Sequence, residues 1–260
     1  MQYPVQIRSG GFHLSGTFHK NARSKKEAPA ILILHGFGGN RIGRFQLYVK
    51  ISRILEKEGF AVLRFDFRGC GESEGTLEKT TFLSQLDDAK KAFQMLLRQP
   101  EVDKNRIGII GSSMGGCLAL MLAQEESQIA SIVLWSAFGR PKATVRQKIG
   151  IKAMKALRSS GRLDIGGEYI SRRFVEEALQ LDTLKNIHTF GCKVLIIHGT
   201  EDESIPPSES ALIYQAARNK GIKAERYLIK GADHSYSRAQ WRQFLFSKTL
   251  DWFKKTLHNK

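Results

Sequence analysis

Short apolar runs alternate with longer segments of helical periodicity along most of the chain. The apolar runs are rich in Ile, Val and Leu and lie at residues 30–34, 60–65, 106–110, 130–135, 193–197 and 224–229. Continuous apolar runs of this length are typical of strands that are buried on both faces of a parallel sheet. Segments of helical period separate or follow them, at residues 45–58, 81–98, 113–124, 208–219 and 239–256. The alternation predicts an α/β fold with a doubly wound, mostly parallel sheet.

Two segments ahead of this series differ from it, because apolar and polar residues alternate along them. They cover residues 5–8 and 12–18, and Ser9, Gly10 and Gly11 separate them. Alternation with a period of two indicates strands, and a Gly-rich connection of this length favours a hairpin. We therefore expect an N-terminal antiparallel hairpin at the edge of the sheet.

One interval is too long for a simple connection between strands. About fifty residues separate the run ending near Ser136 from the run beginning near Cys192, whereas most connections are much shorter. The interval contains a basic amphipathic segment at 143–158, a Gly-Gly pair at 166–167 that favours a hairpin, and a second helical segment at 171–180. The pattern predicts an inserted cap.

The expected boundaries place residues 1–138 and 191–260 in a core domain and residues 139–190 in the cap. Open parallel sheets bind ligands at the carboxyl ends of their strands, so we expect the cap to cover that edge. The basic segment of the cap also carries an apolar stripe, for which two interpretations stay open. The stripe either covers the active site or contacts an anionic membrane surface, as basic amphipathic helices do.

The segment 111–115 reads Gly-Ser-Ser-Met-Gly and matches the Gly-x-Ser-x-Gly pattern of a nucleophilic serine, with Ser113 at its centre. It lies directly between the apolar run 106–110 and a helical segment. A sharp turn between strand and helix exposes the serine oxygen, and glycines on either side avoid clashes in that turn. We predict that Ser113 is the nucleophile.

A second match to the same pattern, Gly-Glu-Ser-Glu-Gly at residues 71–75, lacks this context. It follows a loop rather than a strand, and no helical segment begins directly after it. We therefore interpret Ser73 as part of a turn.

A nucleophilic serine needs a general base, and the base needs an acid that fixes its tautomer and orientation. His234 follows the apolar run 224–229, so it lies at the carboxyl end of a predicted strand, where ligand sites of open parallel sheets form. The chain order of serine, acid and histidine differs from the order in the two well-known serine protease folds. We predict that His234 is the general base.

The identity of the acid stays open among four carboxylates. Glu201, Asp202 and Glu203 are adjacent after the run 193–197, and Asp233 precedes His234 directly. Asp202 is our prediction, and the other three remain alternatives.

Acyl transfer also requires backbone N–H groups that face the developing oxyanion. The segment 35–39 reads His-Gly-Phe-Gly-Gly and follows the first parallel strand. Its three glycines permit unusual backbone angles, so that the Phe37 N–H can face the site while the Met114 N–H supplies the second donor. We predict these two amides as the oxyanion hole.

Taken together, these motifs resemble those of the α/β-hydrolase superfamily over nearly the whole chain. The matching segments are His-Gly-Phe-Gly-Gly-Asn at 35–40, Asp-Phe-Arg-Gly-Cys-Gly-Glu-Ser at 66–73, Gly-Ser-Ser-Met-Gly at 111–115, His-Gly-Thr-Glu-Asp at 198–202, and His234. The aromatic residue after His-Gly and the size and position of the cap are similar to those of bacterial cinnamoyl (feruloyl) esterase-like and monoacylglycerol lipase-like enzymes. The resemblance implies hydrolysis of carboxylic esters without a metal or organic cofactor, with Phe37 and Met114 at the oxyanion positions.

The composition of the chain indicates its cellular compartment. No apolar stretch approaches the ~20 residues that cross a bilayer, and the first residues lack a basic, apolar leader. The three cysteines, Cys70, Cys117 and Cys192, lack the spacing of a zinc site or a disulfide framework. We therefore expect a cytoplasmic protein with reduced thiols and no metal site.

The net charge of +16 favours anionic partners through long-range attraction. The chain carries no nucleic-acid reading motif and no aromatic residues interleaved with its basic ones. We expect a small-molecule ester as the partner, no nucleic acid and no stable membrane insertion, with peripheral membrane contact left open. The sequence does not determine the oligomeric state.

Two classes of function fit these residues. The first is a serine esterase that acts on small to medium acyl groups through an acyl-enzyme intermediate; a thioesterase, lipase or peptidase would use the same triad. The second is a ligand receptor that retains the hydrolase fold without turnover. Kinetics with an activated ester separates them, because an enzyme releases product continuously and a receptor stalls.

Overall fold

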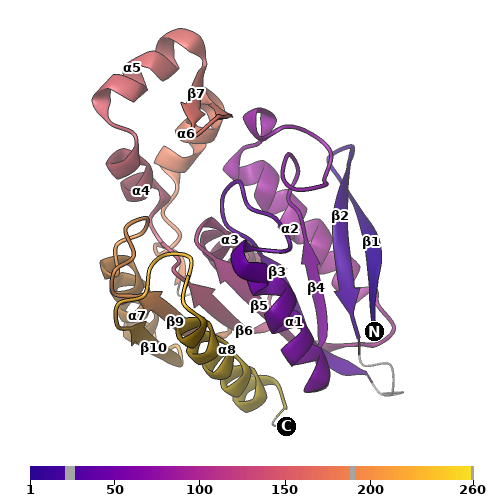
Figure 1. The fold of residues 1–260 in the computed structure, drawn as a ribbon. Helices are drawn as coiled ribbons and strands as arrows, with labels where there is room; N and C mark the ends of the chain where they lie inside the picture. Colours follow the sequence, from indigo (N-terminus) through magenta and orange to yellow (C-terminus); the bar gives the residue numbers. More distant parts are fainter. Residues whose placement is uncertain (21–26, 188–190, 259–260) are drawn as a thin grey trace.

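Eight strands form one sheet in the computed structural model, which describes residues 1–20, 27–187 and 191–258 (Figure 1). The strands are β1 (Gln2–Ser9), β2 (Phe12–His19), β3 (Ala28–Leu34), β4 (Ala61–Phe65), β5 (Val102–Ser112), β6 (Ile129–Trp135), β9 (Lys193–Gly199) and β10 (Ala224–Ile229). Their order across the sheet is β1-β2-β4-β3-β5-β6-β9-β10. β1 is antiparallel to β2 and β2 to β4, whereas the remaining pairs are parallel. The predicted mostly parallel sheet with an N-terminal hairpin is confirmed.

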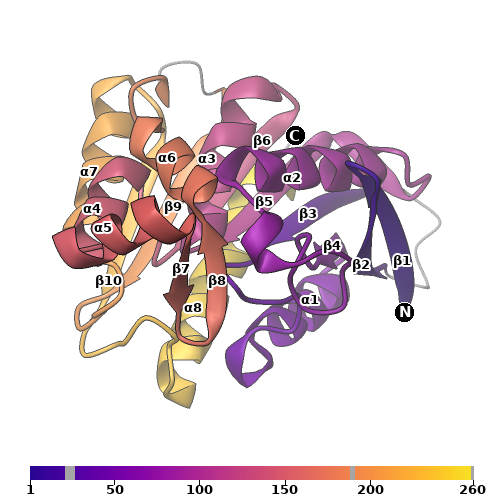
Figure 2. The ribbon, with the colours of Figure 1, turned by 90° about the horizontal axis from the view of Figure 1, so that it is seen from above.

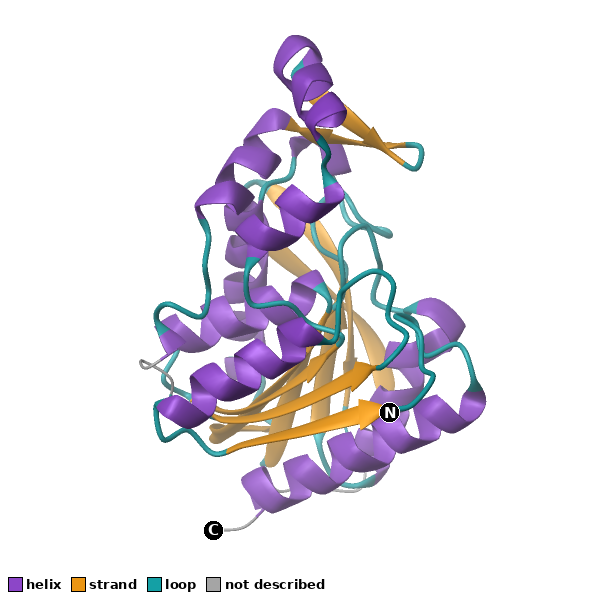
Figure 3. Ribbon diagram, turned by 90° about the vertical axis from the view of Figure 1, so that its left-hand side faces the viewer, coloured by secondary structure: helices purple, strands orange, loops and turns teal. Residues whose placement is uncertain are grey.

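Helices cover both faces of the sheet (Figure 3). On one face lie α1 (Leu47–Lys57) and α8 (Ala239–Phe253), and on the other lie α2 (Phe82–Leu97), α3 (Met114–Glu125) and α7 (Ser208–Asn219). Three short helical segments are η1 (Arg44–Gln46), η2 (Leu77–Lys79) and η4 (Lys254–His258).

The two-sided packing explains why β3 is a continuous apolar run. Leu32 and Leu34 belong to the core beneath α2 and α3, whereas Ile31 and Ile33 belong to the core beneath α1 and α8. Because successive side chains of a strand point to opposite faces, a strand buried on both faces must be apolar at every position.

The cap consists of α4 (Pro141–Lys148), α5 (Ile151–Ser160), β7 (Arg162–Ile165), β8 (Glu168–Ser171) and α6 (Arg172–Gln180). It stands at one end of the sheet in Figure 1 and overlies the core in Figure 2. β7 and β8 form an antiparallel hairpin whose turn contains Gly166 and Gly167 with φ of 67° and 94°. Oγ of Ser171 accepts the N–H of Phe174 at 3.1 Å and so caps α6 at its N-terminus.

The basic segment expected as one helix over 143–158 forms two helices instead. Ile149 ends α4 in an extended conformation, with φ of −101° and ψ of 96°, and Gly150 precedes α5. Glycine is a poor helix former, so the break falls at the point of least helical preference. The break also turns Ile149 inward, where its side chain is buried.

Phe174 docks the cap on the core. Its ring lies 5.4 Å from the ring of Phe37 and 4.9 Å from that of Phe82, centroid to centroid. These are contact distances for aromatic pairs. No helix among the described residues is both long and apolar enough to cross a membrane.

Candidate active site

Ser113 lies on a strained turn between β5 and α3. Its φ of 52° and ψ of −120° are unusual for a residue other than glycine. Its N–H donates to the carbonyl oxygen of Trp135 at 2.9 Å, which ties the turn to β6. A Cβ on Gly111 would lie only 2.6 Å from the carbonyl oxygen of Gly115, and a Cβ on Gly115 would overlap the backbone of Leu34. The tight turn therefore requires glycine on both sides of the serine.

His234 and Asp202 come together from two neighbouring loops. Asp202 follows β9 and His234 follows β10, and these strands are paired in parallel. Nδ1 of His234 lies 2.8 Å and 2.9 Å from the two carboxylate oxygens of Asp202. Because an ionised carboxylate only accepts hydrogen bonds, Nδ1 carries the proton, and Nε2 of the neutral ring is left as an acceptor. A general base needs this tautomer.

The Asp202 carboxylate has further partners. It accepts the N–H of Ser204 at 2.9 Å and of Ile205 at 2.8 Å, and Nε2 of His198 lies 3.1 Å from it. Burial opposes ionisation of this group, but hydrogen bonds from His198, His234 and Ile205 outweigh burial and hold the pKa of Asp202 well below its ordinary value. Asp202 is therefore ionised at neutral pH and can stabilise an imidazolium.

The other three candidate acids have different surroundings. Oδ1 of Asp233 accepts two backbone N–H groups of its own turn, each at 3.0 Å. Glu201 and Glu203 line a depression beside the histidine. Among the described residues, none of these three carboxylates forms a hydrogen bond with His234, so the structure brings only Asp202 to the ring.

His198 is not among the site residues that the sequence predicts. The available signal was its position at the carboxyl end of a strand, four residues before Asp202 in the same loop. Its Nε2 donates to the carbonyl oxygen of Ile205 at 2.9 Å as well as facing Asp202, and its side chain is fully buried.

Ser113 and His234 line one pocket, together with Phe37 and Lys148. No hydrogen bond joins Oγ of Ser113 to His234 within the part of the chain that the structure describes. In hydrolases this contact commonly shortens only when substrate binds.

The two predicted oxyanion donors flank the serine. Met114 is the first residue of α3, so its N–H precedes the first i to i−4 hydrogen bond of the helix. Phe37 follows Gly36, where a Cβ would lie 3.2 Å from Cβ of Ser113. The backbone beside Phe37 thus approaches the serine closely.

His35 holds this loop. Its Nδ1 lies 2.8 Å from the carbonyl oxygen of Gly36, and its Nε2 accepts the N–H of Phe67 at 3.1 Å. Burial lowers the pKa of His35, which keeps the ring neutral.

Ser73 lies in the loop after β4. Its Oγ donates to the carbonyl oxygen of Asp66 at 2.6 Å and accepts the N–H of Ser15 at 2.9 Å. The first bond holds the loop together and the second ties it to β2, and no hydrogen bond joins this hydroxyl to His234 within the described residues.

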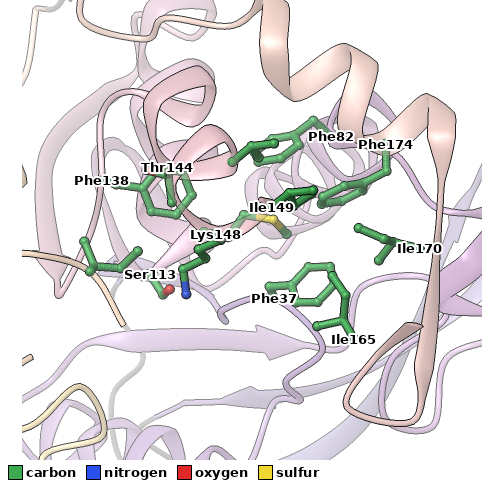
Figure 4. A pocket seen from close by; sticks show the side chains of 13 residues that line it. Phe37, Phe82, Ser113, Phe138, Thr144, Lys148, Ile149, Ile165, Ile170 and Phe174 are labelled. Carbon is green, nitrogen blue, oxygen red and sulfur yellow. The ribbon is translucent and has the colours of Figure 1, made fainter. Parts of the chain in front are cut away.

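A second, apolar cavity of about 170 Å³ lies between the core and the cap and also contains Ser113 (Figure 4). Ser113, Thr144 and Lys148 are its only polar lining residues among those described. The others are Phe37, Phe82, Met114, Phe138, Val145, Ile149, Ile165, Ile170, Phe174 and Ile205. The described residues contain no group of three or more His, Cys, Asp or Glu side chains placed to hold a metal ion.

Comparison with known proteins shows the family to which the chain belongs. The prolyl oligopeptidase family matches residues 46–260, which is most of the chain. The chain belongs to the prolyl oligopeptidase family. With this family match and the sheet described above, it is a hydrolase of the α/β-hydrolase superfamily.

This member of the prolyl oligopeptidase family has relatives of several kinds. It is 27% identical over 235 residues to the uncharacterized protein YfhR of Salmonella typhi, covering 86% of this chain and 71% of YfhR. It is 26% identical over 221 residues to the mitochondrial palmitoyl-protein thioesterase ABHD10 of Rattus norvegicus, covering 82% and 71%. The solved structure of Est1E from Butyrivibrio proteoclasticus with bound ferulic acid matches with a TM-score of 0.86 at 21% identity, covering 98% of this chain and 100% of Est1E. The likeness to Est1E shows a shared fold.

Proposed function

We propose that this hydrolase cleaves carboxylic esters of small to medium acyl groups, with Ser113 as nucleophile, His234 as general base and Asp202 as the triad acid. The hydrogen bond between Nδ1 of His234 and Asp202 carries the proposal. It orients the imidazole and places the proton of its neutral form on Nδ1, which leaves Nε2 as an acceptor in the pocket that Ser113 also lines.

The reaction proceeds in two halves. Oγ of Ser113 attacks the ester carbonyl carbon while Nε2 of His234 accepts the hydroxyl proton, and the N–H groups of Phe37 and Met114 stabilise the oxyanion. His234 then donates the proton to the leaving alcohol as the ester C–O bond breaks, which leaves an acyl group on Ser113. Water, deprotonated by His234, attacks this acyl-enzyme, and the carboxylic acid and free Ser113 are released.

The apolar cavity supports an acyl group of limited size. At about 170 Å³ it is close to the ~150 Å³ engineered cavity that binds benzene. A hexanoyl or aromatic acyl group fits such a volume far better than a palmitoyl chain.

A panel of substrates tests the proposal. p-Nitrophenyl esters of rising chain length, methyl ferulate, an acyl-CoA and a peptide amide are compared, with Ser113→Ala as the blank. We expect continuous turnover that is highest for short and medium esters. A single stoichiometric burst would indicate a receptor, and preference for the amide would indicate a peptidase.

Thioester hydrolysis is the second candidate, because a palmitoyl-protein thioesterase is among the relatives. An acyl-CoA hydrolysed faster than the p-nitrophenyl ester of the same chain length would favour thioester hydrolysis.

The thiols of Cys70, Cys117 and Cys192 are buried and form no disulfide, which supports a cytoplasmic location.

A further inference from the structure

Lys148, the last residue of α4, borders both pockets of the active site. It lines the apolar cavity beneath the cap and also the outer pocket that holds Ser113 and His234. In Figure 4 its side chain extends toward Ser113. Lys148 lies within the basic amphipathic segment that the sequence predicts at 143–158.

The two pockets receive different halves of an ester. His234 must deliver a proton to the leaving group, and it lines the outer pocket but not the apolar cavity. In the proposed reaction the leaving group would therefore occupy the outer pocket, and the acyl group would occupy the apolar cavity. Lys148 lies at the junction of the two.

Cationic and neutral polar side chains line the outer pocket, together with Phe37, Leu47 and Tyr48. Lys148 and Arg44 contribute positive charge, and Asn40, Ser204 and Ser235 contribute neutral polar groups. No Asp or Glu is among the described residues that line it. Glu201, Glu203 and Asp233 line the adjacent depression, which Arg44 and His234 also border.

Lys148 differs from several other basic residues of the cap because no carboxylate neutralises it among the described residues. Four cap arginines are paired with glutamates, namely Arg140 with Glu209, Arg162 with Glu78, Arg172 with Glu176 and Arg173 with Glu177. An unpaired ammonium group beside the reacting serine leaves a charge that substrate can satisfy.

We propose that the outer pocket binds an anionic group on the leaving half of the substrate, through Lys148 with Arg44 at the rim. The substrate class is then an ester with a compact apolar acyl group and an alcohol that carries a carboxylate or a phosphate. This proposal rests on the proposed ester hydrolysis and adds the charge of the leaving group. The ammonium of Lys148 binds the anion in both the intact ester and the released alcohol.

Matched ester pairs test this selectivity. The first pair is 4-(hexanoyloxy)benzoate and its methyl ester, and the second is 1-hexanoylglycerol 3-phosphate and 1-hexanoylglycerol. The measured quantity is the ratio of kcat/KM for the anionic ester to that for the neutral ester. Lys148→Met and Lys148→Arg are compared with Lys155→Met, a control with the same charge change, because Lys155 lines a different groove of the cap.

We expect Lys148→Met to lower the ratio about tenfold, as loss of one charge-assisted hydrogen bond does. Lys148→Arg should restore most of it, and Lys155→Met should leave it unchanged. Raising the salt from about 20 mM to about 500 mM should also lower the wild-type ratio, because the distance over which charges attract becomes shorter across that range. The pair that shows the effect identifies the anion as carboxylate or phosphate.

Three results would overturn the proposal. A ratio that Lys148→Met does not change in either pair would remove the anion subsite and leave ester hydrolysis intact. An equal fall in Lys155→Met would assign the preference to diffuse charge on the cap. If the wild-type protein hydrolysed none of the four matched esters and also failed to hydrolyse p-nitrophenyl hexanoate, ester hydrolysis itself would be wrong.

Discussion

Nε2 of His198 lies 3.1 Å from the carboxylate of Asp202, so that this acid has a second histidine partner besides His234. His198 contacts no reacting atom and would act by positioning. We expect His198→Gln to lower kcat about tenfold with little change in KM, because Asp202 loses one of the hydrogen bonds that orient and ionise it.

The pH profile separates this effect from simple destabilisation. Loss of the His198 bond raises the pKa of Asp202 toward its ordinary value, so the part of the acid-side loss of activity that comes from protonating Asp202 should begin at a higher pH than in the wild type. His13→Gln, in the N-terminal hairpin, is the control and should keep the wild-type profile. An unchanged profile, with kcat lowered only in proportion to folded protein, would make His198 purely structural.

Ser113→Ala should reduce esterase activity by about a thousandfold or more, because the acyl-enzyme can no longer form. Ser73→Ala should retain most activity, since the hydroxyl of Ser73 bonds Asp66 and Ser15 and, among the described residues, does not bond His234. Both variants are assayed with p-nitrophenyl hexanoate after their circular dichroism has been compared with that of the wild type.

A fluorophosphonate probe gives an independent readout of the same assignment. Mass spectrometry should locate one adduct, on Ser113, in the wild type and none in Ser113→Ala. Labelling of another residue would contradict the assignment.

Asp202→Asn should lower kcat roughly a thousandfold or more, because an amide does not stabilise the imidazolium and favours the wrong tautomer of His234. Asp233→Asn makes the same chemical change next to His234 in sequence, but Asp233 forms its hydrogen bonds with Ser235 and Ser237 of its own turn. Both Asp233→Asn and Glu203→Gln should lower kcat far less than Asp202→Asn does. Should Asp233→Asn be the more damaging variant in steady-state kinetics, the acid would be misassigned.

Iodoacetamide should leave activity intact at pH 8, because the thiols are buried and largely protonated. Burial raises the pKa of Cys70 and of Cys192 to about 12, and it also raises that of Cys117. A raised pKa means that the reactive thiolate forms only at higher pH, so at pH 8 its fraction is roughly a thousandfold below that of a free cysteine.

Intact-mass spectrometry checks the thiols directly. The native protein should carry no carbamidomethyl groups, and the denatured protein should carry three, one for each cysteine. Rapid inactivation of the native protein would place a cysteine in the reaction.

Local patterns in the sequence determined the elements of the core and selected Ser113 as the predicted nucleophile. An apolar run is buried on both faces wherever it lies in a parallel sheet, and this is why the strands of the core could be predicted without coordinates. Ser113 could be distinguished from Ser73 because the turn between strand and helix is itself a local feature. The N-terminal hairpin followed from alternation with a period of two.

Relations between distant or adjacent polar residues were decided only by the tertiary structure. Glu201, Asp202 and Glu203 are indistinguishable by position, and the loop backbone alone decides which carboxylate meets His234 from the next strand. The break at Gly150 depended on packing of the cap as well as on helix preference.

The charge of the cap shows the same division. Composition determined how many basic residues the chain has, but not which of them are neutralised, because an ion pair such as Arg140 with Glu209 joins residues far apart in sequence. The position of Lys148 beside Ser113 depends on how the cap docks, and side-chain packing such as that of Phe174 on Phe37 and Phe82 sets this docking. Hydrophobic periodicity depends on residues that are neighbours in sequence, whereas a site consists of side chains that only folding brings together.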